Sequence, residues 1–348
     1  MTKRFFITVL ASIVALAVPQ RLSASGGEGE EFSPKEMVME HLADSYIWEI
    51  TTIKGREIAI PLPVIVRSST GWHVFMSDKI CHGGTYKGLY LATEGKYKNK
   101  VVENVSGVQK RPLDISLTKT ACGLIFSLLV VLILFLVTAR AYKKREEVDY
   151  CPKGLAGLME WLIDSILNNV IKPCVGENYL KFAPYLLTAF FFIFISNLLG
   201  LIPFFPGGAN VTGNISITLF MALATMLAVN LFGTKHYYKE IFWPEVPVFL
   251  KAIPLMPIIE MIGIITKPFA LMMRLFANIF AGHSIILSIC SIIFVTAHLG
   301  VAVNGSMTAV SVFFMIFMNF LELLVAFIQA YVFTMLSAVF IGLAQEKH

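Results

Sequence analysis

Long hydrophobic segments alternate with short charged ones from residue 115 to the C-terminus. The first contains no Asp, Glu, Lys or Arg from Ala121 to Ala139. A membrane-spanning helix needs about 20 apolar residues, so this segment predicts a span over about 115–138. Basic residues mark the cytoplasmic end of a span, and a cluster of them follows, which places the N-terminus outside the cytoplasm. The cluster consists of Arg140, Lys143, Lys144 and Arg145.

A second uncharged stretch runs for 53 residues, from Phe182 to Thr234. One span cannot use that length. Prolines and glycines at 203–208 divide the stretch, which predicts two spans over roughly 183–203 and 212–233.

Two shorter segments are expected on the cytoplasmic side of the membrane. Residues 153–175 are apolar with interspersed Glu160 and Asp164, a pattern typical of an amphipathic helix lying in the membrane interface. Pro173 is expected to stop this helix. Residues 240–254 contain several prolines and predict a proline-rich connection.

The last two hydrophobic segments are longer than a membrane is thick. One extends from Leu255 to about Val295, and the other from Met307 to Leu343, with a turn expected at Gly300 to Gly305. Because each exceeds a perpendicular span, we expect both to be strongly tilted or partly in the membrane plane.

The N-terminal region differs in character. Residues 1–25 resemble a secretory signal, with Lys3 and Arg4 before an apolar core and small residues at a cleavage site; an uncleaved anchor would leave the next region on the same side. Residues 26–114 are polar, with short β-like runs and turn signals, and predict a small extracytoplasmic domain. The membrane domain then comprises 115–348.

The composition agrees with this pattern, since 56% of the residues are hydrophobic and 15% are charged. The predicted fold is an all-α polytopic membrane protein with about five membrane-embedded helices, an interfacial helix and a small β-containing N-terminal domain. The net charge of +5 comes without a basic patch interleaved with aromatic residues, so nucleic acid is not expected as a partner. His73, Cys81 and His82 fit no standard zinc spacing, and no metal or cofactor is expected.

One arginine, Arg274, lies in the middle of an apolar segment, and the next Asp, Glu, Lys or Arg after it is Glu322. An arginine at mid-membrane costs about 2.5–3.5 kcal/mol and usually faces a water-filled cavity or a partner. It stays protonated at physiological pH. Arg274 therefore predicts a fixed electrostatic gate for a mobile carboxylate or ion. The alternative is an arginine that snorkels from a helix end.

Polar residues at helical spacing accompany this arginine. Glu260 and Lys267 precede Arg274 at intervals of seven, and Asn278 follows one turn later. Residues seven apart lie within about 20° on a helix, so the four predict one polar stripe. Helix packing or nearness to the cytoplasm is the alternative explanation for Glu260 and Asn278.

Two further residues are suited to proton exchange. His283 is nine residues after Arg274 and points roughly to the opposite side of its helix, while Glu322 and Gln329 share a face of the final helix. A carboxyl group and an imidazole can each exchange protons near neutral pH when burial and a neighbouring group act on them. We expect them to serve an outer half-channel and Glu260 an inner one, with Arg274 between. The alternative for Glu322 is a buried carboxyl bonded to helix neighbours.

Two runs of sequence resemble a known family. The run from Lys267 to His283, K-P-x-x-L-x-x-R-L-F-A-N-x-x-A-G-H, looks like the signature helix of subunit a, the stator proton-channel subunit of F-type ATP synthases. Residues Leu321 to Phe333 are similar to that family's final helix. The resemblance covers about 115–345. It implies a tilted hairpin of the last two helices around a rotating ring, in a bacterial inner membrane, with the C-terminus in the cytoplasm.

The resemblance also implies roles for the candidate residues. The family's arginine faces the carboxylate of the subunit c ring, and Glu260 matches the acidic position 14 residues before it. Many bacterial members carry Glu and His at the two outer-channel positions; His283 and Glu322 have the exchanged order of mitochondrial-type members. The residues that match motif positions directly are Arg274, Asn278 and Gln329.

The implied partners are the subunit c ring, the subunit b peripheral stalk, the remainder of the complex and membrane lipid. The translocated ion is a proton, or sodium if the ion site of the ring selects it. The stretch from Asn214 to Leu219 resembles a polar lining of the outer access path; interhelical hydrogen bonds are the alternative, for Asn197 and Asn210 as well.

Two other classes of protein compete with this interpretation. A secondary transporter with an intramembrane Arg/Glu/His site would show repeated halves with broken helices, and no such repeat is evident. An intramembrane hydrolase is less favoured, because the sequence has no HExxH or GxSxG motif. There is no Walker motif either, so we expect a non-catalytic transport subunit whose partners bind the nucleotide.

Overall fold

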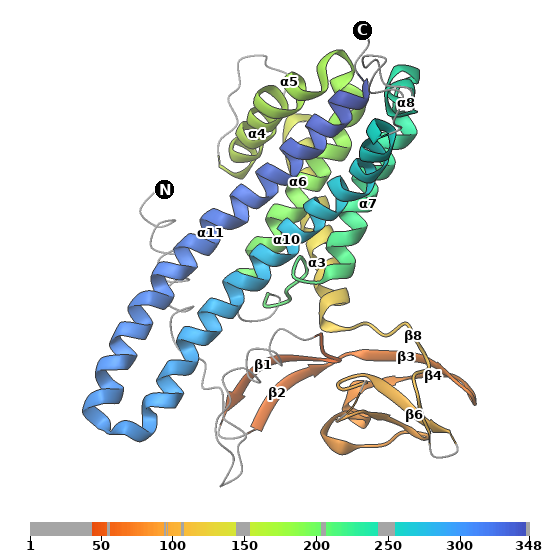
Figure 1. The fold of residues 1–348 in the computed structure, drawn as a ribbon. Helices are drawn as coiled ribbons and strands as arrows, with labels where there is room; N and C mark the ends of the chain where they lie inside the picture. The colour runs from red at the N-terminus through yellow and green to blue at the C-terminus, as the bar shows by residue number, and fades with distance from the viewer. Residues whose placement is uncertain are drawn as a thin grey trace. The chain divides into compact units, whose positions relative to one another are not determined.

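The computed structural model describes residues 44–345 with seven short gaps (Figure 1). The gaps are 54–55, 94, 96, 106–107, 144–153, 203–206 and 243–254. The predicted signal sequence at 1–25 and most of the proline-rich connection therefore lie outside the described residues. The chain divides into two compact parts, which we call part I and part II. Part I comprises 1–126, 199–211 and 283–320; part II comprises 127–198, 212–282 and 321–348.

Part I contains a β region in which three small antiparallel sheets are formed. Their strand orders are β1-β2, β4-β3-β8 and β5-β6-β7. The prediction of a small β-containing N-terminal region is thereby confirmed. The strands are β1 (Ile47–Ile53), β2 (Arg56–Pro61), β3 (Pro63–Ser68), β4 (Gly71–Met76), β5 (Leu89–Leu91), β6 (Val101–Val105), β7 (Val108–Lys110) and β8 (Leu113–Asp114).

Strand alternation builds the core of this region. Val64 and Val66 of β3 are fully buried, together with Phe75 of β4, Leu89 of β5 and Val101 of β6. Successive side chains of a strand point to opposite faces of the sheet, so Val64 and Val66 enter the same apolar cluster, to which Phe75, Leu89 and Val101 also belong.

A buried carboxylate joins two of the sheets. Ser69, in the turn between β3 and β4, donates its backbone N–H (3.0 Å) and its hydroxyl to the side chain of Glu103 on β6. The hydroxyl bond, followed by the backbone bond, holds the pKa of Glu103 below its usual value, because both bonds favour the ionised form.

The β region is hydrogen-bonded to the start of α3 (Lys119–Lys143). The Leu117 backbone N–H donates to the carbonyl of Pro63 (3.2 Å). The Asp44 carboxylate accepts from both the backbone N–H (3.0 Å) and the hydroxyl (2.8 Å) of Thr120. Free N–H groups in the first turn of a helix favour such an acceptor, so the first turn of α3 is fixed to the strands.

Among the described residues, five helical segments are long and apolar enough to cross a membrane, which agrees with the predicted number. They contain α3, the run from α4 to α6, α7, α10 and α11. The remaining bounds are α4 (Leu155–Ile166), a π-helical turn (Leu167–Ile171), α5 (Lys172–Val175), a 3-10 turn (Gly176–Asn178), α6 (Tyr179–Leu201), α7 (Ile215–Phe232), α8 (Lys235–Phe242), α10 (Leu255–Val295) and α11 (Val301–Gln345).

Two predicted boundaries are wrong. Pro173 does not stop the helix before it, because it occupies the first turn of α5, where a proline needs no N–H partner. The chain turns instead at Gly176, whose φ of +77° suits glycine. The turn after α10 ends at Gly300, and α11 begins at Val301, so Gly305 lies within the helix rather than in a turn.

Aromatic and hydroxyl contacts hold the helices of part II together. Tyr185 of α6 hydrogen-bonds Thr225 of α7 (2.8 Å), and Thr225 is 3.3 Å from the Ser337 hydroxyl of α11. The rings of Phe190 on α6 and Phe327 on α11 meet edge to face. These contacts place α11 against both α6 and α7.

The C-terminal end of α11 is held at several points. The Thr234 N–H donates to the carbonyl of Ala344 (2.9 Å), and Gln345 bonds the carbonyl of Phe232. Gly342 packs so closely on the carbonyl of Cys174 that a Cβ there would collide with the carbonyl oxygen. We call this set of contacts the C-terminal clamp.

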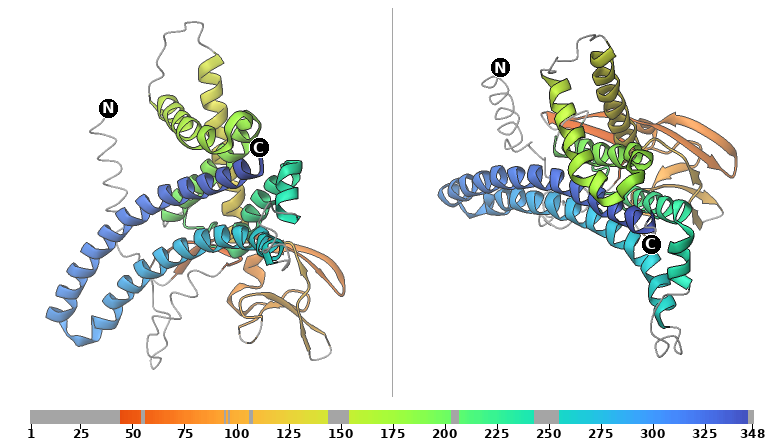
Figure 2. Two further views of the ribbon diagram at one scale, coloured as in Figure 1. Left: turned by 45° about the horizontal axis from the view of Figure 1, so that its top comes forward. Right: turned by 90° about the horizontal axis from the view of Figure 1, so that it is seen from above.

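α10 and α11 run antiparallel beside each other, joined by the turn that ends at Gly300 (Figures 1 and 2). They contain 41 and 45 residues, which correspond to about 60 and 70 Å at 1.5 Å per residue. A hydrocarbon core is about 30 Å thick. Their lengths agree with the expectation that neither helix stands perpendicular to the membrane.

We predict that Gly342→Ala destabilises the protein, because the added methyl meets backbone that cannot move away cheaply. Overpacking of this kind costs about 1–3 kcal/mol. Thermal unfolding of the detergent-solubilised full-length protein measures the loss. Gly305→Ala in the same helix is the matched control, since nothing lies within 4 Å of the added Cβ. Equal melting temperatures for both variants would contradict the close packing.

Candidate functional site

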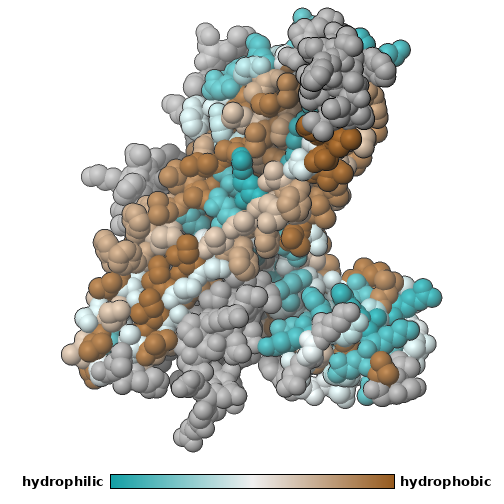
Figure 3. Space-filling view, in the orientation of Figure 1, coloured by the Kyte–Doolittle hydropathy of each residue, from teal (hydrophilic) through white to brown (hydrophobic). Residues whose placement is uncertain are grey.

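Arg274 is the twentieth of the 41 residues of α10, so snorkelling from a helix end does not explain it. Its side chain is exposed on the surface of the chain, and exposed apolar neighbours such as Phe269 and Met273 surround it along the helix. Figure 3 shows hydrophilic atoms within the otherwise hydrophobic surface of the helices. A permanent charge on such a surface needs water or a polar partner.

Asn278, one turn after Arg274, is bonded to the final helix. Its side-chain nitrogen donates to the Gln329 Oε1 of α11 (3.1 Å). Gln329 is only 4% exposed, and a buried amide needs such a partner. The sequence identified both residues by their motif positions, but it did not predict that they bond to each other. The bond fixes α11 against the part of α10 that carries Arg274.

The Glu322 carboxylate of α11 lies beside Gly282 of α10. The carboxylate is 5% exposed, and a Cβ on Gly282 would lie 3.0 Å from its Oε1 and 3.3 Å from its carboxyl carbon. Any larger residue at 282 would therefore press on the acid. Sequence reasoning missed this role of Gly282, although the glycine belongs to the motif that precedes His283.

His283 belongs to part I. A Cβ on Gly200, at the C-terminal end of α6, would lie 3.8 Å from the His283 Nε2, so the imidazole stands beside this glycine. The functional pairing of His283 with Glu322 stays a prediction.

Glu260 and Lys267 come together on α10, as their spacing predicts. A Cβ on Gly263, between them, would be 3.9 Å from both Glu260 Oε2 and Lys267 Cε. The Lys267 ammonium also lies 5.8 Å from the ring centre of Phe340 on α11. Burial, followed by the neighbouring Tyr238 and Glu260, raises the pKa of Tyr237 on α8.

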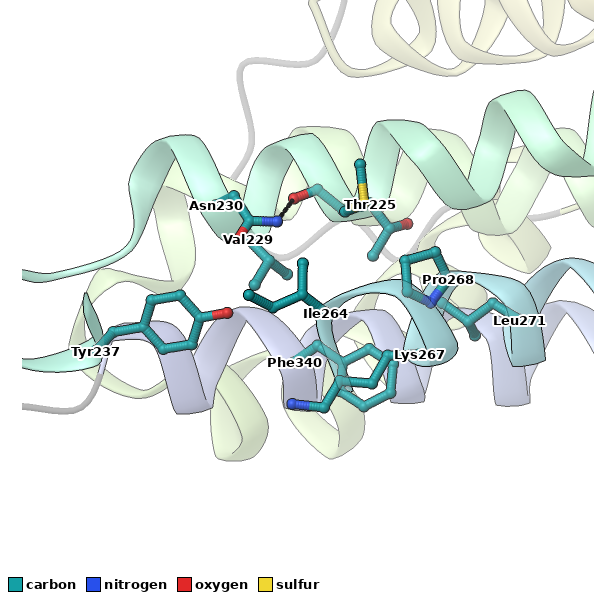
Figure 4. A pocket seen from close by; sticks show the side chains of 10 residues that line it. Thr225, Val229, Asn230, Tyr237, Ile264, Lys267, Pro268, Leu271 and Phe340 are labelled. Atoms are coloured by element: carbon teal, nitrogen blue, oxygen red, sulfur yellow. Dashed lines mark hydrogen bonds between the residues drawn. The ribbon is translucent and has the colours of Figure 1, made fainter. Parts of the chain in front are cut away.

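A small cavity of about 20 Å³ lies beside Lys267 (Figure 4). That volume holds about one water molecule. The Tyr237 hydroxyl points toward Val229 and Ile264 in its wall (Figure 4). The cavity thus lies between α7, α8, α10 and α11, near the end of the polar stripe that carries Glu260.

Two of the asparagines expected near the outer end of the α6–α7 hairpin have structural partners. Asn197 donates to the carbonyl of Ala326 (3.3 Å) and accepts from the Thr212 hydroxyl (2.6 Å). Asn214 caps α7, where its side chain accepts from the Ser216 N–H (3.0 Å). Interhelical bonding and helix capping therefore account for these two residues without a channel.

Comparisons with known proteins match both regions of the chain. Residues 124–342 match the family described as ATP synthase A chain. Residues 37–115 match a family described as a domain of unknown function, DUF8433. The β region thus has relatives, but their description assigns it no role.

Named relatives are similar over about two thirds of this chain or more. "ATP synthase subunit a 2" of Chlorobaculum tepidum is 46% identical over 240 residues, which cover 66% of this chain and 64% of that protein. This chain therefore matches slightly less than two thirds of that relative's length. "ATP synthase subunit a" of Chloroherpeton thalassium is 42% identical over 68% of this chain and 69% of its own. The protein of the same name from Anaeromyxobacter sp. is 33% identical over 95% of this chain and 75% of its own.

We predict that Asn278→Ala lowers stability by about 1–3 kcal/mol, since it leaves the buried Gln329 amide without this donor. A double-mutant cycle with Gln329→Ala should show coupling, because the second substitution costs less once the bond is gone. Thermal unfolding of all four proteins measures both quantities. Asn319→Ala is the control, since Asn319 bonds only within α11, to the carbonyl of Met315, in the hydrogen bonds described for it. Strictly additive losses would show that the bond contributes nothing.

Proposed function

The chain belongs to the family of the ATP synthase A chain, the proton-translocating stator subunit a of F-type ATP synthases, and on that premise we propose how its residues conduct ions. The protein is a multi-pass membrane protein and a transport subunit of the ATP synthase complex. Its direct partners are proposed to be the subunit c ring and the subunit b peripheral stalk. Catalysis on the nucleotide resides in other subunits.

Arg274 carries the proposal. Its exposed guanidinium lies midway along α10, on a face that could meet a carboxylate of the ring. A fixed positive charge lowers the pKa of an approaching carboxyl group, so the carboxyl must release its proton before it passes. The same charge opposes direct hopping of protons past it, which would separate two aqueous half-channels.

The other candidate residues are assigned to either side of the arginine. Glu322 and His283 are proposed to exchange protons with the outer half-channel, and Glu260 with the inner one. The bond from Asn278 to Gln329 (3.1 Å) is proposed to hold the face of Arg274 in place.

The proposed orientation puts the N-terminus outside the cytoplasm and the C-terminus inside, in the bacterial inner membrane. Residues 1–25 would be a signal peptide, 26–114 an extracytoplasmic domain and 115–348 the membrane domain. Each charge that crosses at 100 mV supplies about 2.3 kcal/mol, so several must cross for each ATP. Protons are proposed as the ion, with sodium as the alternative that the ring would decide. The family match disfavours a secondary transporter.

We predict that Arg274→Gln abolishes ATP-driven acidification of inverted membrane vesicles and adds a passive proton leak, because the barrier between the half-channels is lost. The assembled complex must be present at the normal level. Arg140→Gln, at the last turn of α3, removes a basic residue outside the proposed path and should pump normally. Normal pumping by Arg274→Gln would refute the gate.

We predict that Gly282→Ala slows proton pumping by about tenfold, since the new methyl lies 3.0 Å from the Glu322 carboxylate and displaces it by a fraction of an ångström. A displacement of 1 Å can cost about 100-fold in rate. Gly263→Ala is the matched control in α10, because its nearest side-chain atoms are 3.9 Å away, an ordinary contact. Equal pumping by the two variants would argue against a precise position for Glu322.

A further inference from the structure

The sheet β4-β3-β8 of the β region is apolar on both faces. Its buried face carries Val64, Val66 and Phe75. An antiparallel sheet with one covered face usually presents polar residues on the other. Here the second face presents apolar side chains instead, and the proposed ion path gives them no role.

The register of the strands shows how this second face is built. Residues directly opposite each other in antiparallel strands point to the same side. Arg67 of β3 lies opposite both Trp72 and Leu113. Ile65 lies opposite Val74 and receives a hydrogen bond from the Ile115 backbone N–H (3.0 Å).

A third row of residues completes this second face. In it, Pro63 lies opposite Met76, and the Pro63 carbonyl accepts a hydrogen bond from the Leu117 N–H (3.2 Å). We call the nine residues of these rows the open sheet face. They are Leu113, Arg67, Trp72, Ile115, Ile65, Val74, Leu117, Pro63 and Met76.

The open sheet face is accessible and almost wholly apolar. Val74 is 68% exposed, Leu113 57%, and Trp72 and Ile115 56% each. The one charged member, Arg67, places its guanidinium 5.9 Å from the centre of the Trp72 ring. Large exposed apolar patches mark interaction sites, so we expect a partner to cover this face.

The open sheet face leads directly into a membrane helix. The row of Leu117 ends two residues before α3 begins at Lys119, and Asp44 fixes the first turn of α3 to the β region through Thr120. The sheet therefore cannot move far from the bilayer surface at which α3 enters. Figure 3 shows a hydrophobic patch on the β region on the side from which α3 leaves it in Figure 1.

We propose that the open sheet face rests on the lipid bilayer, at the surface where α3 enters the membrane. The apolar residues would lie at the boundary of headgroups and acyl chains, where tryptophan is enriched. Ile125, near the start of α3, is likewise exposed and apolar. This role is additional to ion conduction and does not depend on the gate.

The charge of the region fits the same partner. Residues 44–118 contain ten Lys or Arg and seven Asp or Glu, a net charge of +3. Anionic headgroups attract basic segments held close to a membrane. Arg67 can keep its charge at headgroup level while its stem and Trp72 contact lipid.

The test uses the intact complex in proteoliposomes that contain anionic phospholipid and a phospholipid with a photoactivatable acyl chain. After illumination, mass spectrometry locates lipid adducts on the full-length chain. We expect adducts on the peptides of β4 and of Leu113–Leu117 as well as on α3. The internal control is β7, where Val108 is 68% exposed but lies in another sheet; it should be labelled severalfold less.

A pair of variants makes the result specific. Val74→Glu places a charge on the open sheet face, and Val108→Glu places the same charge on β7; both sites are exposed, so neither should disturb folding. Loss of adducts around β4 in Val74→Glu, with no loss in Val108→Glu, supports the proposal. Adducts on α3 without any on β4 would overturn it. In a parallel sample treated with a protein–protein cross-linker, cross-links from this face to another subunit would also overturn it, in favour of a protein partner.

Discussion

A permanent positive charge on an apolar surface is the constraint on which the membrane region depends. Arg274 cannot lose its proton, and lipid does not solvate it. Its helix must therefore be held so that the guanidinium meets water or a polar group and nothing else. Contacts about one and two turns after it serve this need: Asn278 binds Gln329, and Gly282 admits the carboxylate of Glu322. Polar groups that would be costly in isolation are thus gathered along one seam between α10 and α11.

The helices could largely be predicted from the sequence, because a bilayer imposes a simple length requirement on apolar segments. The predicted start of α10 at Leu255 and its end at Val295 agree with the structure. The wrong predictions concern a glycine and a proline, residues that often end a helix but that these helices contain. Gly305 looks like a turn residue, yet a glycine inside a long apolar helix costs only about 1 kcal/mol, so the helix continues through it. Pro173 looks like a stop, but it falls in the first turn of α5, where a proline is tolerated.

The candidate site could be predicted only as a set of residues. Helical spacing placed Glu260 and Lys267 on one face correctly, because both belong to one helix. No spacing rule relates Asn278 to Gln329, which are 51 residues apart. The role of Gly282 depends on which atom approaches it, and that follows only from the packing of α11. For Asn214 the sequence left a lining of the access path and interhelical hydrogen bonds open, and the structure shows a third role, the cap of α7.

The C-terminal clamp has a mechanical consequence for Glu322, which is not one of its residues. α11 is a stiff rod supported at Gly342 and again at Gln329, and Glu322 lies beyond the second support. Gln329 is 13 residues, or about 20 Å of helix, from Gly342 and seven residues, or about 10 Å, from Glu322. If the rod pivots about Gln329, a sideways shift at Gly342 moves the carboxylate in the opposite direction by about half as much. Slack at the C-terminal end therefore reaches Glu322 at reduced amplitude, and the position of Gly342 is coupled to that of the acid.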